Sequence, residues 1–371
     1  MDPPPPQEEP PKSPPRKRPG RTSVLPAAKR KRDEEEEQPD SRPQKQKQPA
    51  NKVPDRGVEN IVREHYNNVP ERGAKWRTTD SKITGLRVYN NWCKSVLINK
   101  AGHGTHRANV LDIGCGKGGD LQKWAPQHIA NYIGLDIADV SIQQAKERYR
   151  EGFNKRKLRF HADFIARDCF SGTLADVPQV ASIGYDTSGG DRWAQGGGFD
   201  VVSIMFVMHY AFESEQKART MLQNVSNSLK KGGKFIGVIP NSDVISDKVA
   251  KGSKEWGNSI YSVRFPGEVP SDGVFRPPFG WKYIYHLEEA VDAPEYVIPW
   301  ESLRGLAEDY NLELEFRMPF KEIWEEEKDD REFGMLAEKM RVKDPRTGEL
   351  RASKEELEAA YLYQGFIFYK V

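Results

Sequence analysis

One run of residues, Val110–Asp120, constrains the fold more than any other part of this 371-residue sequence. Its apolar first part, with Asn109 just before it, has the composition of a buried β-strand that ends at Ile113. Glycines then break the strand, and glycine lets backbone approach a ligand closely where a helix begins. A second apolar run, Tyr132–Asp136, ends in a carboxylate that can accept hydrogen bonds from a ribose. Together these features predict an α/β protein that binds a nucleoside cofactor.

Two carboxylates, Asp112 and Asp120, flank the glycine-rich turn. They would repel a pyrophosphate at the helix N-terminus, whereas the sulfonium and ammonium groups of S-adenosylmethionine would be attracted to them. The sequence therefore favours S-adenosylmethionine over a nicotinamide dinucleotide as the cofactor.

Strand-like and helix-like segments alternate along the chain. The expected strands are 109–113, 132–136, 158–166, 199–206, 234–239, 313–316 and 363–370. The expected helices are 57–66, 81–99, 118–125, 139–152 and 213–229, with further helices within 321–360. This alternation predicts a doubly wound, mainly parallel, seven-stranded Rossmann-like sheet. The aromatic, Pro- and Gly-rich stretch 242–300 interrupts the alternation and predicts a substrate-side insertion or lid, and 185–198 predicts a surface loop.

The first 52 residues differ in composition from the rest of the chain. They hold 13 of the 26 prolines, no aromatic residue, and 13 Lys and Arg against 9 Asp and Glu. Such a segment buries too little apolar surface to offset its ordering entropy, so a disordered tail over 1–52 and a catalytic domain over 53–371 are predicted. Its basic clusters, Arg16–Arg18 and Lys29–Arg32, favour nuclear import, with a solvated charged tail as the alternative.

Neither a signal peptide nor a membrane span is expected, because no apolar stretch has the required length and position. The three cysteines, Cys93, Cys115 and Cys169, lack metal-ligand spacing and are too few for a disulfide framework. An intracellular protein without a metal site is the expectation.

Four segments carry a resemblance to a known family: Tyr89–Ile98, Val110–Trp124, Asp136–Ser141 and Phe206–Glu213. From about residue 57 to its end, the sequence resembles the eukaryotic, fungal-like mRNA cap (guanine-N7) methyltransferases. Glycine loops of this kind are common to most methyltransferases. The Asn-Asn-Trp-Cys-Lys and His-Tyr-Ala-Phe-Glu elements within these segments are much more specific to the family.

The resemblance implies a role for each matching residue. Positions that match the cofactor site are Lys94 and Gly114 near the methionyl end, Asp136 at the ribose, Asp168 near the adenine, Met205, and Tyr210 between cofactor and cap. Positions that match the guanine pocket are Asn90, Asn91, His209, Glu295 and Tyr363, and those near the cap phosphates are Lys117, Lys123 and Arg148. Met205 stands where the family usually has Gln, and a thioether cannot replace the hydrogen bonds of an amide.

The residue chemistry agrees with these roles. Cations suit a triphosphate, and a carboxylate such as Glu295 can accept the N–H donors of guanine. The implied reaction is methyl transfer to guanine N7, which already carries a lone pair, so neither a general base nor a metal is expected. His209 and Tyr210 would accelerate the reaction by positioning the guanine against the methyl group.

The implied partners are 5′-capped mRNA and the transcription or capping machinery, and the catalytic unit is expected to be monomeric and nuclear. Two alternatives stay open. One is a methyltransferase that acts on a small molecule or a protein, and the other is a non-catalytic RNA-binding or scaffold protein with a methyltransferase fold.

Overall fold

The computed structural model describes residues 57–68, 80–187 and 197–371. All of these belong to one compact unit, Pro54–Val371. The tail predicted over 1–52, its two basic clusters and most of the loop predicted over 185–198 lie outside the described residues.

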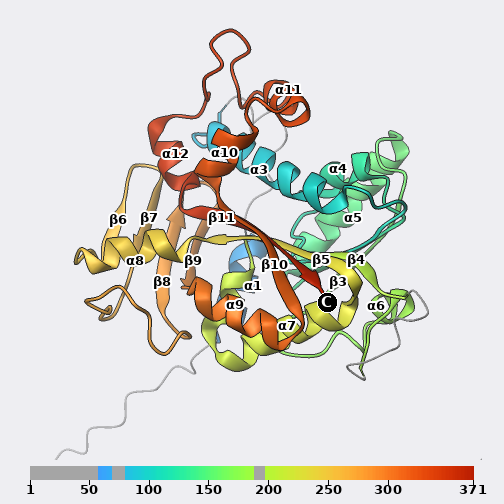
Figure 1. The fold of residues 1–371 in the computed structure, drawn as a ribbon, viewed down its shortest axis with the longest axis horizontal. Coiled ribbons are helices and arrows are strands. Elements are labelled where there is room, and N and C mark those ends of the chain that lie inside the picture. Colours follow the sequence, from blue (N-terminus) through green and yellow to red (C-terminus); the bar gives the residue numbers. More distant parts are fainter. Residues whose placement is uncertain (1–56, 69–79, 188–196) are drawn as a thin grey trace, which may run out of the picture. The chain divides into compact units, whose positions relative to one another are not determined.

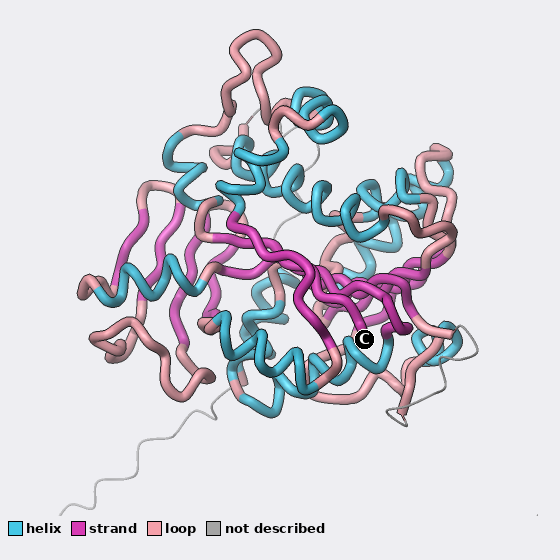
Figure 2. Tube along the Cα trace, in the orientation of Figure 1, coloured by secondary structure: helices cyan, strands magenta, loops and turns pink. Residues whose placement is uncertain are grey.

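A seven-stranded sheet forms the centre of the described unit, in the order β10-β11-β5-β4-β1-β2-β3 (Figures 1 and 2). Its strands are β1 Asn109–Ile113, β2 Asn131–Asp136, β3 His161–Ala166, β4 Phe199–Met205, β5 Leu229–Pro240, β10 Leu312–Pro319 and β11 Tyr363–Lys370. The five strands β3, β2, β1, β4 and β5 run parallel, and β11 pairs antiparallel with both β5 and β10. The predicted mainly parallel, seven-stranded sheet is confirmed.

Helices cover both faces of this sheet. They are α1 Val58–Asn68, α3 Thr84–Gly102, α4 Leu121–Trp124, α5 Asp139–Asn154, α6 Pro178–Ile183, α7 Glu215–Ser228, α8 Ser242–Ala250, α9 Trp300–Asp309, α10 Phe320–Glu327, α11 Arg331–Lys339 and α12 Lys354–Ala360, with 3₁₀ turns η1 Ala125–Gln127 and η3 Met208–Glu213. Buried side chains of α3, α5, α10 and α12 form one apolar core, and those of α6, α7 and α9 form another. The apolar runs of β1 and β4 are buried between the two, as expected for parallel strands covered on both faces.

Several predicted boundaries were wrong for local reasons. The helix expected from Glu213 begins at Glu215, because the Ser214 hydroxyl accepts a hydrogen bond from the Lys217 amide and caps the helix, while Glu213 ends η3. The helix expected over 118–125 spans only α4, and the strand expected from 158 begins at 161. The strand expected over 234–239 begins at Leu229, and its pairing with β4 shifts register between Leu229 and Lys234.

The stretch 242–300 contains α8 and a second, antiparallel sheet in the order β6-β7-β8-β9. Its strands are β6 Glu255–Gly257, β7 Tyr261–Arg264, β8 Lys282–Leu287 and β9 Val291–Tyr296. Its last strand contacts α1 and η3. The predicted insertion is confirmed, and its action as a lid stays a prediction.

Candidate active site

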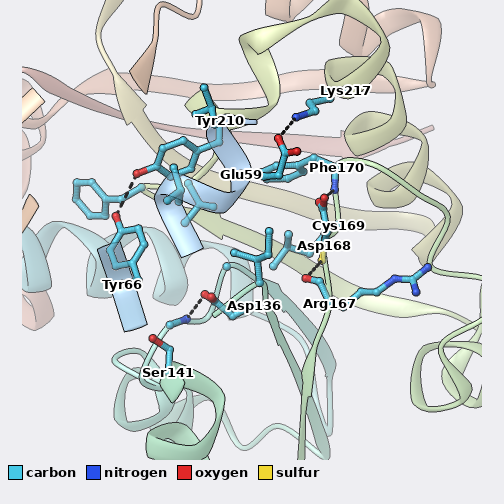
Figure 3. Close-up of a pocket in the computed structure, with 18 of the residues that line it drawn as sticks. Glu59, Tyr66, Asp136, Ser141, Arg167, Asp168, Cys169, Phe170, Tyr210 and Lys217 are labelled. Carbon is cyan, nitrogen blue, oxygen red and sulfur yellow. Dashed lines mark hydrogen bonds and ion pairs between the residues drawn. The ribbon is translucent and has the colours of Figure 1, made fainter. Parts of the chain in front are cut away.

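A cavity of about 260 Å³ lies where the parallel strands of the large sheet end (Figure 3). Its floor comes from Ile113 at the end of β1 and Gly114 after it, Asp136 at the end of β2, Asp168 after β3 and Met205 at the end of β4. Helix α1 supplies another wall with Val58, Glu59, Val62 and Tyr66. Ligands of doubly wound proteins bind at this edge of the sheet, so the cavity is the expected cofactor site.

Gly114 makes the turn at the floor of this cavity. Its φ is +74°, and a Cβ built there would lie 2.5 Å from Cγ2 of Val207. Its amide donates to the Leu135 carbonyl at 2.7 Å, which ties the turn to β2. Any side chain would therefore strain the backbone and displace Val207.

Asp136 and Asp168 are the carboxylates at the ends of β2 and after β3. Asp136 accepts hydrogen bonds from the amides of Gly116 and Ala138 at 2.8 and 2.9 Å, one on each oxygen. Burial raises the pKa of Asp136, although these two amides oppose the shift. Asp168 accepts from the Phe170 amide at 2.9 Å. Each carboxylate is thus fixed at the cavity and keeps acceptor capacity for a ligand, and Asp136 fits the hydroxyls of a ribose.

Neither Asp112 nor Asp120, whose charges favoured S-adenosylmethionine in the sequence, is among the residues that line this cavity. Asp112 lies buried behind the glycine loop and accepts hydrogen bonds from the hydroxyls of Tyr132 and Ser203. Burial and then the nearby Asp120 raise the pKa of Asp112. The fit to a nucleoside cofactor rests instead on the glycine turn, Asp136 and Asp168.

A second cavity, of about 230 Å³, gathers five residues predicted for the guanine pocket. They are Asn90 and Asn91 on α3, His209 on η3, Glu295 on β9 and Tyr363 on β11. These residues come from four elements that are distant along the chain. Lys94 also lines this cavity rather than the first, and its ammonium pairs with Asp120 at 2.7 Å.

Buried polar atoms without partners mark this second cavity as a site for a polar ligand. Both ring nitrogens of His209 and Oδ1 of Asn90 are buried and make no hydrogen bond within the described part of the chain. Burial lowers the pKa of His209 to about 3. Burial also raises the pKa of Glu295 to about 8, although the Tyr283 hydroxyl, which donates to it at 2.8 Å, opposes the shift. Unpaired buried groups are costly, so a ligand with matching donors and acceptors would be bound strongly.

Comparison with known proteins places the chain in a family. Residues 50–371 match the family model described as the mRNA (guanine-N(7))-methyltransferase domain. A protein of Aspergillus oryzae described as an mRNA cap guanine-N(7) methyltransferase is 51% identical over 85% of this chain and 76% of its own length. A protein of Schizosaccharomyces pombe with the same description is 47% identical over 84% of this chain and 82% of its own length. The chain belongs to the mRNA (guanine-N(7))-methyltransferase family.

The match to other members of the mRNA (guanine-N(7))-methyltransferase family is not always full-length. A relative from Aspergillus niger, with the same description, is 56% identical over 83% of this chain, and the chain spans 54% of that relative's length. Among solved structures, a magnesium protoporphyrin IX methyltransferase from Synechocystis matches with a TM-score of 0.46 and 12% identity, covering 85% of this chain and all of that one. No helix in the described ranges is both long and apolar enough to cross a membrane.

In this guanine-N(7)-methyltransferase family member, the two cavities share a wall made by Tyr66 and Phe206. The Tyr66 hydroxyl lies 3.2 Å from the Tyr210 hydroxyl (Figure 3). Phe206 has a φ of +64°, and its ring packs edge-to-face on Tyr363 with centroids 4.8 Å apart. Neither wall residue was among those predicted for the site. Phe206 begins one of the specific family segments, whereas nothing in the local pattern around Tyr66 distinguishes it from an ordinary helical residue.

The residues predicted for the cap phosphates are only partly brought together. Lys123 and Arg148 line a third, open cavity of about 980 Å³, here called the outer groove, and Lys117 is not among its lining residues. The Lys123 ammonium pairs with Asp120 at 2.8 Å. Burial lowers the pKa of Lys123, and Asp120 opposes that shift. Asp120 is thus held by two ammonium groups, from Lys94 in the second cavity and from Lys123 in the outer groove.

Proposed function

We propose that this protein transfers the methyl group of S-adenosylmethionine to N7 of the guanosine cap of mRNA, giving m7GpppN and S-adenosylhomocysteine. The observation that carries the proposal is the shared wall of Tyr66 and Phe206 between the two cavities. A methyl donor in the first cavity and a guanine in the second would be neighbours. The relatives described as mRNA cap guanine-N(7) methyltransferases support the same reaction.

The first cavity would hold the cofactor, which supplies a methyl group on a sulfonium. Asp136 would accept the ribose hydroxyls, Asp168 would lie near the adenine, and Gly114 would admit the methionyl part beside its backbone. Met205, which is buried at the end of β4, would contribute packing rather than hydrogen bonds. Lys94 lines the second cavity beside Asp120, and its ammonium lies 5.7 Å from the centre of the Phe206 ring. It would therefore act close to the wall between the two cavities.

The second cavity would select guanine and position it. Glu295 would accept hydrogen bonds from guanine N1–H and N2–H₂, and His209 and Tyr363 would offer ring surfaces for stacking. Guanine N7 already has a lone pair, so none of these residues needs to remove a proton before attack. The protein would accelerate the reaction by fixing N7 toward the wall of Tyr66 and Phe206 and by excluding water from a buried pocket.

The proposal extends to the biological setting. The substrate is the capped 5′ end of mRNA, with Lys117, Lys123 and Arg148 as the residues closest to the triphosphate. The protein acts in the nucleus as a monomeric catalytic unit, and the transcription or capping machinery recruits it to the RNA. The cap chemistry and the family support this setting.

Methyl transfer to defined RNA ends tests the proposal. The full chain is incubated with S-adenosylmethionine and RNA that carries GpppA, and the digested product is analysed by chromatography for m7GpppA. RNA that carries ApppA is the matched control, because it has the same triphosphate and no cap guanine. The expected result is methylation of the GpppA end alone. Equal methylation of both ends, or transfer only to a protein or small molecule, would contradict the proposal.

A further inference from the structure

The outer groove begins where the guanine pocket ends. Asn91 lines both, and Lys123 and Arg148 line the groove beside Gly118 and Gly119 of the glycine-rich turn. A cap held by its guanine in the second cavity must carry its triphosphate past this point. Whatever follows the triphosphate therefore enters the outer groove.

Helices α3, α5 and α11 line the outer groove, and α3 and α11 are fixed to each other. Asn91, Ser95 and Asn99 recur every four residues of α3, so they share one face over about 12 Å of helix. Helix α11 is held against α3 by two hydrogen bonds, from Trp92 Nε1 to the Phe333 carbonyl at 3.0 Å and from Asn99 Nδ2 to Glu332 at 2.6 Å. The groove is therefore a formed feature of the fold.

The side chains of the outer groove suit a neutral, partly apolar ligand. Met335, Leu336 and Met340 form an apolar shelf at α11, and Met335 is 62% exposed. Gln144 of α5 lines the groove, and its Oε1 is buried without a hydrogen-bond partner in the described ranges. Amides can both donate to and accept from the edge of a base. The charged side chains that line the groove balance, with three carboxylates, Glu147, Glu151 and Glu332, against three cations, Lys123, Arg148 and Lys339.

We propose that the outer groove binds the first transcribed nucleoside of the RNA, the one joined to the cap guanosine by the triphosphate. This inference rests on the proposed function and adds a second specificity site to it. The base lies on the methionine shelf of α11, Gln144 accepts a hydrogen bond from the nucleoside, and Lys123 and Arg148 face the triphosphate between the two nucleosides. The enzyme thereby binds both nucleosides of the GpppN unit.

Two variants test the nucleoside subsite without touching the guanine pocket. Met335→Ala removes an exposed part of the shelf, and Gln144→Leu removes the unpaired acceptor at similar volume. Val274→Ala, at a site that is 45% exposed and outside the groove, is the control. Calorimetry with S-adenosylhomocysteine present compares GpppA with the γ-methyl ester of GTP, which has a similar triphosphate diester and no second nucleoside. Thermal unfolding checks that each variant is folded.

The wild type is expected to bind GpppA about fivefold more tightly than the methyl ester. Each groove variant should reduce this margin to about one and leave affinity for the methyl ester unchanged, and the control should keep it. Equal affinities in the wild type, or variants that weaken both ligands alike, would overturn the subsite. Methyl transfer to GpppA is measured on the wild type in parallel, so a loss of the proposed function itself is seen separately as the absence of m7GpppA.

Discussion

Nε2 of His209 lies 3.5 Å from Oε1 of Glu295, and both side chains are buried. Burial acts on the two groups in opposite directions, lowering the pKa of His209 to about 3 and raising that of Glu295 to about 8. At neutral pH both side chains are therefore mostly uncharged, and the contact is not an ion pair. The guanine pocket thus holds a carboxyl group that can lose its proton when a ligand with N–H donors arrives.

Glu295→Gln tests whether Glu295 recognises the guanine base. The variant keeps the volume of the side chain but replaces one acceptor oxygen with a donor that opposes the donors of guanine. Methyl transfer to GpppA-capped RNA should fall by at least about tenfold, because a buried mismatched polar group is costly. Cofactor affinity, measured by calorimetry, should stay nearly unchanged. Glu268→Gln, at an exposed ion pair with Lys254, is the matched control and should keep full activity. A parallel loss of cofactor affinity would remove Glu295 from this role.

Affinity for the cap guanosine should rise with pH. Guanine donors favour the carboxylate form of Glu295, whose pKa without ligand is raised to about 8. Below that pKa a proton must leave on binding, so affinity should increase by up to about tenfold per pH unit from pH 6 and level off above about pH 8. His209 stays neutral over this range and adds no slope. Titrations of GpppA at several pH values measure the effect. A flat profile in the wild type, or the same slope in Glu295→Gln, would refute it.

Asp136→Ala should weaken cofactor binding. The carboxylate is the only side-chain acceptor at the end of β2, and lost charge-assisted hydrogen bonds of this kind cost roughly 1.5–3 kcal/mol, a decrease in affinity of about tenfold to a hundredfold. The amides of Gly116 and Ala138 also lose their acceptor, which adds to the effect. Calorimetry with S-adenosylhomocysteine measures the change, and Asp163→Ala, at a half-buried position on β3 outside the cavity, serves as control. Unchanged affinity in a folded variant would exclude Asp136 from the site.

Met205→Gln tests the position at which the resemblance implies Gln in other members of the family. Met205 is 6% exposed and lines the cofactor cavity. An amide there can hydrogen-bond the cofactor, so affinity should rise by about threefold to tenfold. Without cofactor the buried amide lacks a partner, so the free energy of unfolding should fall by about 1–3 kcal/mol. Chemical denaturation with and without S-adenosylhomocysteine separates the two effects. An affinity that stays the same or falls would show that packing at this position suffices.

Removal of residues 1–52 should leave methyl transfer to short capped RNA largely intact and reduce nuclear accumulation. All of the predicted site residues lie after Gly57, whereas the basic clusters Arg16–Arg18 and Lys29–Arg32 lie before it. Activity of the purified truncation and the location of a fluorescent fusion are the two measurements. A folded truncation that loses activity would show that the tail belongs to the catalytic unit.

Local sequence patterns were sufficient for the framework of the site. The apolar run before the glycine loop predicted β1 with its observed bounds, and the last strand, Tyr363–Lys370, was also predicted correctly. Gly114 and Asp136 were placed at strand ends, and parallel strands bring such ends to one edge of a sheet. These features depend on residues close together in the chain, so spacing and composition determine them.

Only the tertiary structure decided which side chains face the ligand. Asp112 and Asp120 flank the same loop, yet one turns into the core toward Tyr132 and the other toward Lys94 and Lys123. Local spacing does not determine these partners, because the direction of a loop side chain depends on what packs behind it.

The assembly of the two cavities was also a tertiary result. Helix α1 places Tyr66 at the cofactor cavity, and the antiparallel sheet of the insertion places Glu295 beside His209. The sequence determined the strands, the glycine turn and the chemistry of the residues that matched the family. Which of those residues meet was determined by how distant segments pair. That pairing depends on long-range packing, which no local pattern encodes.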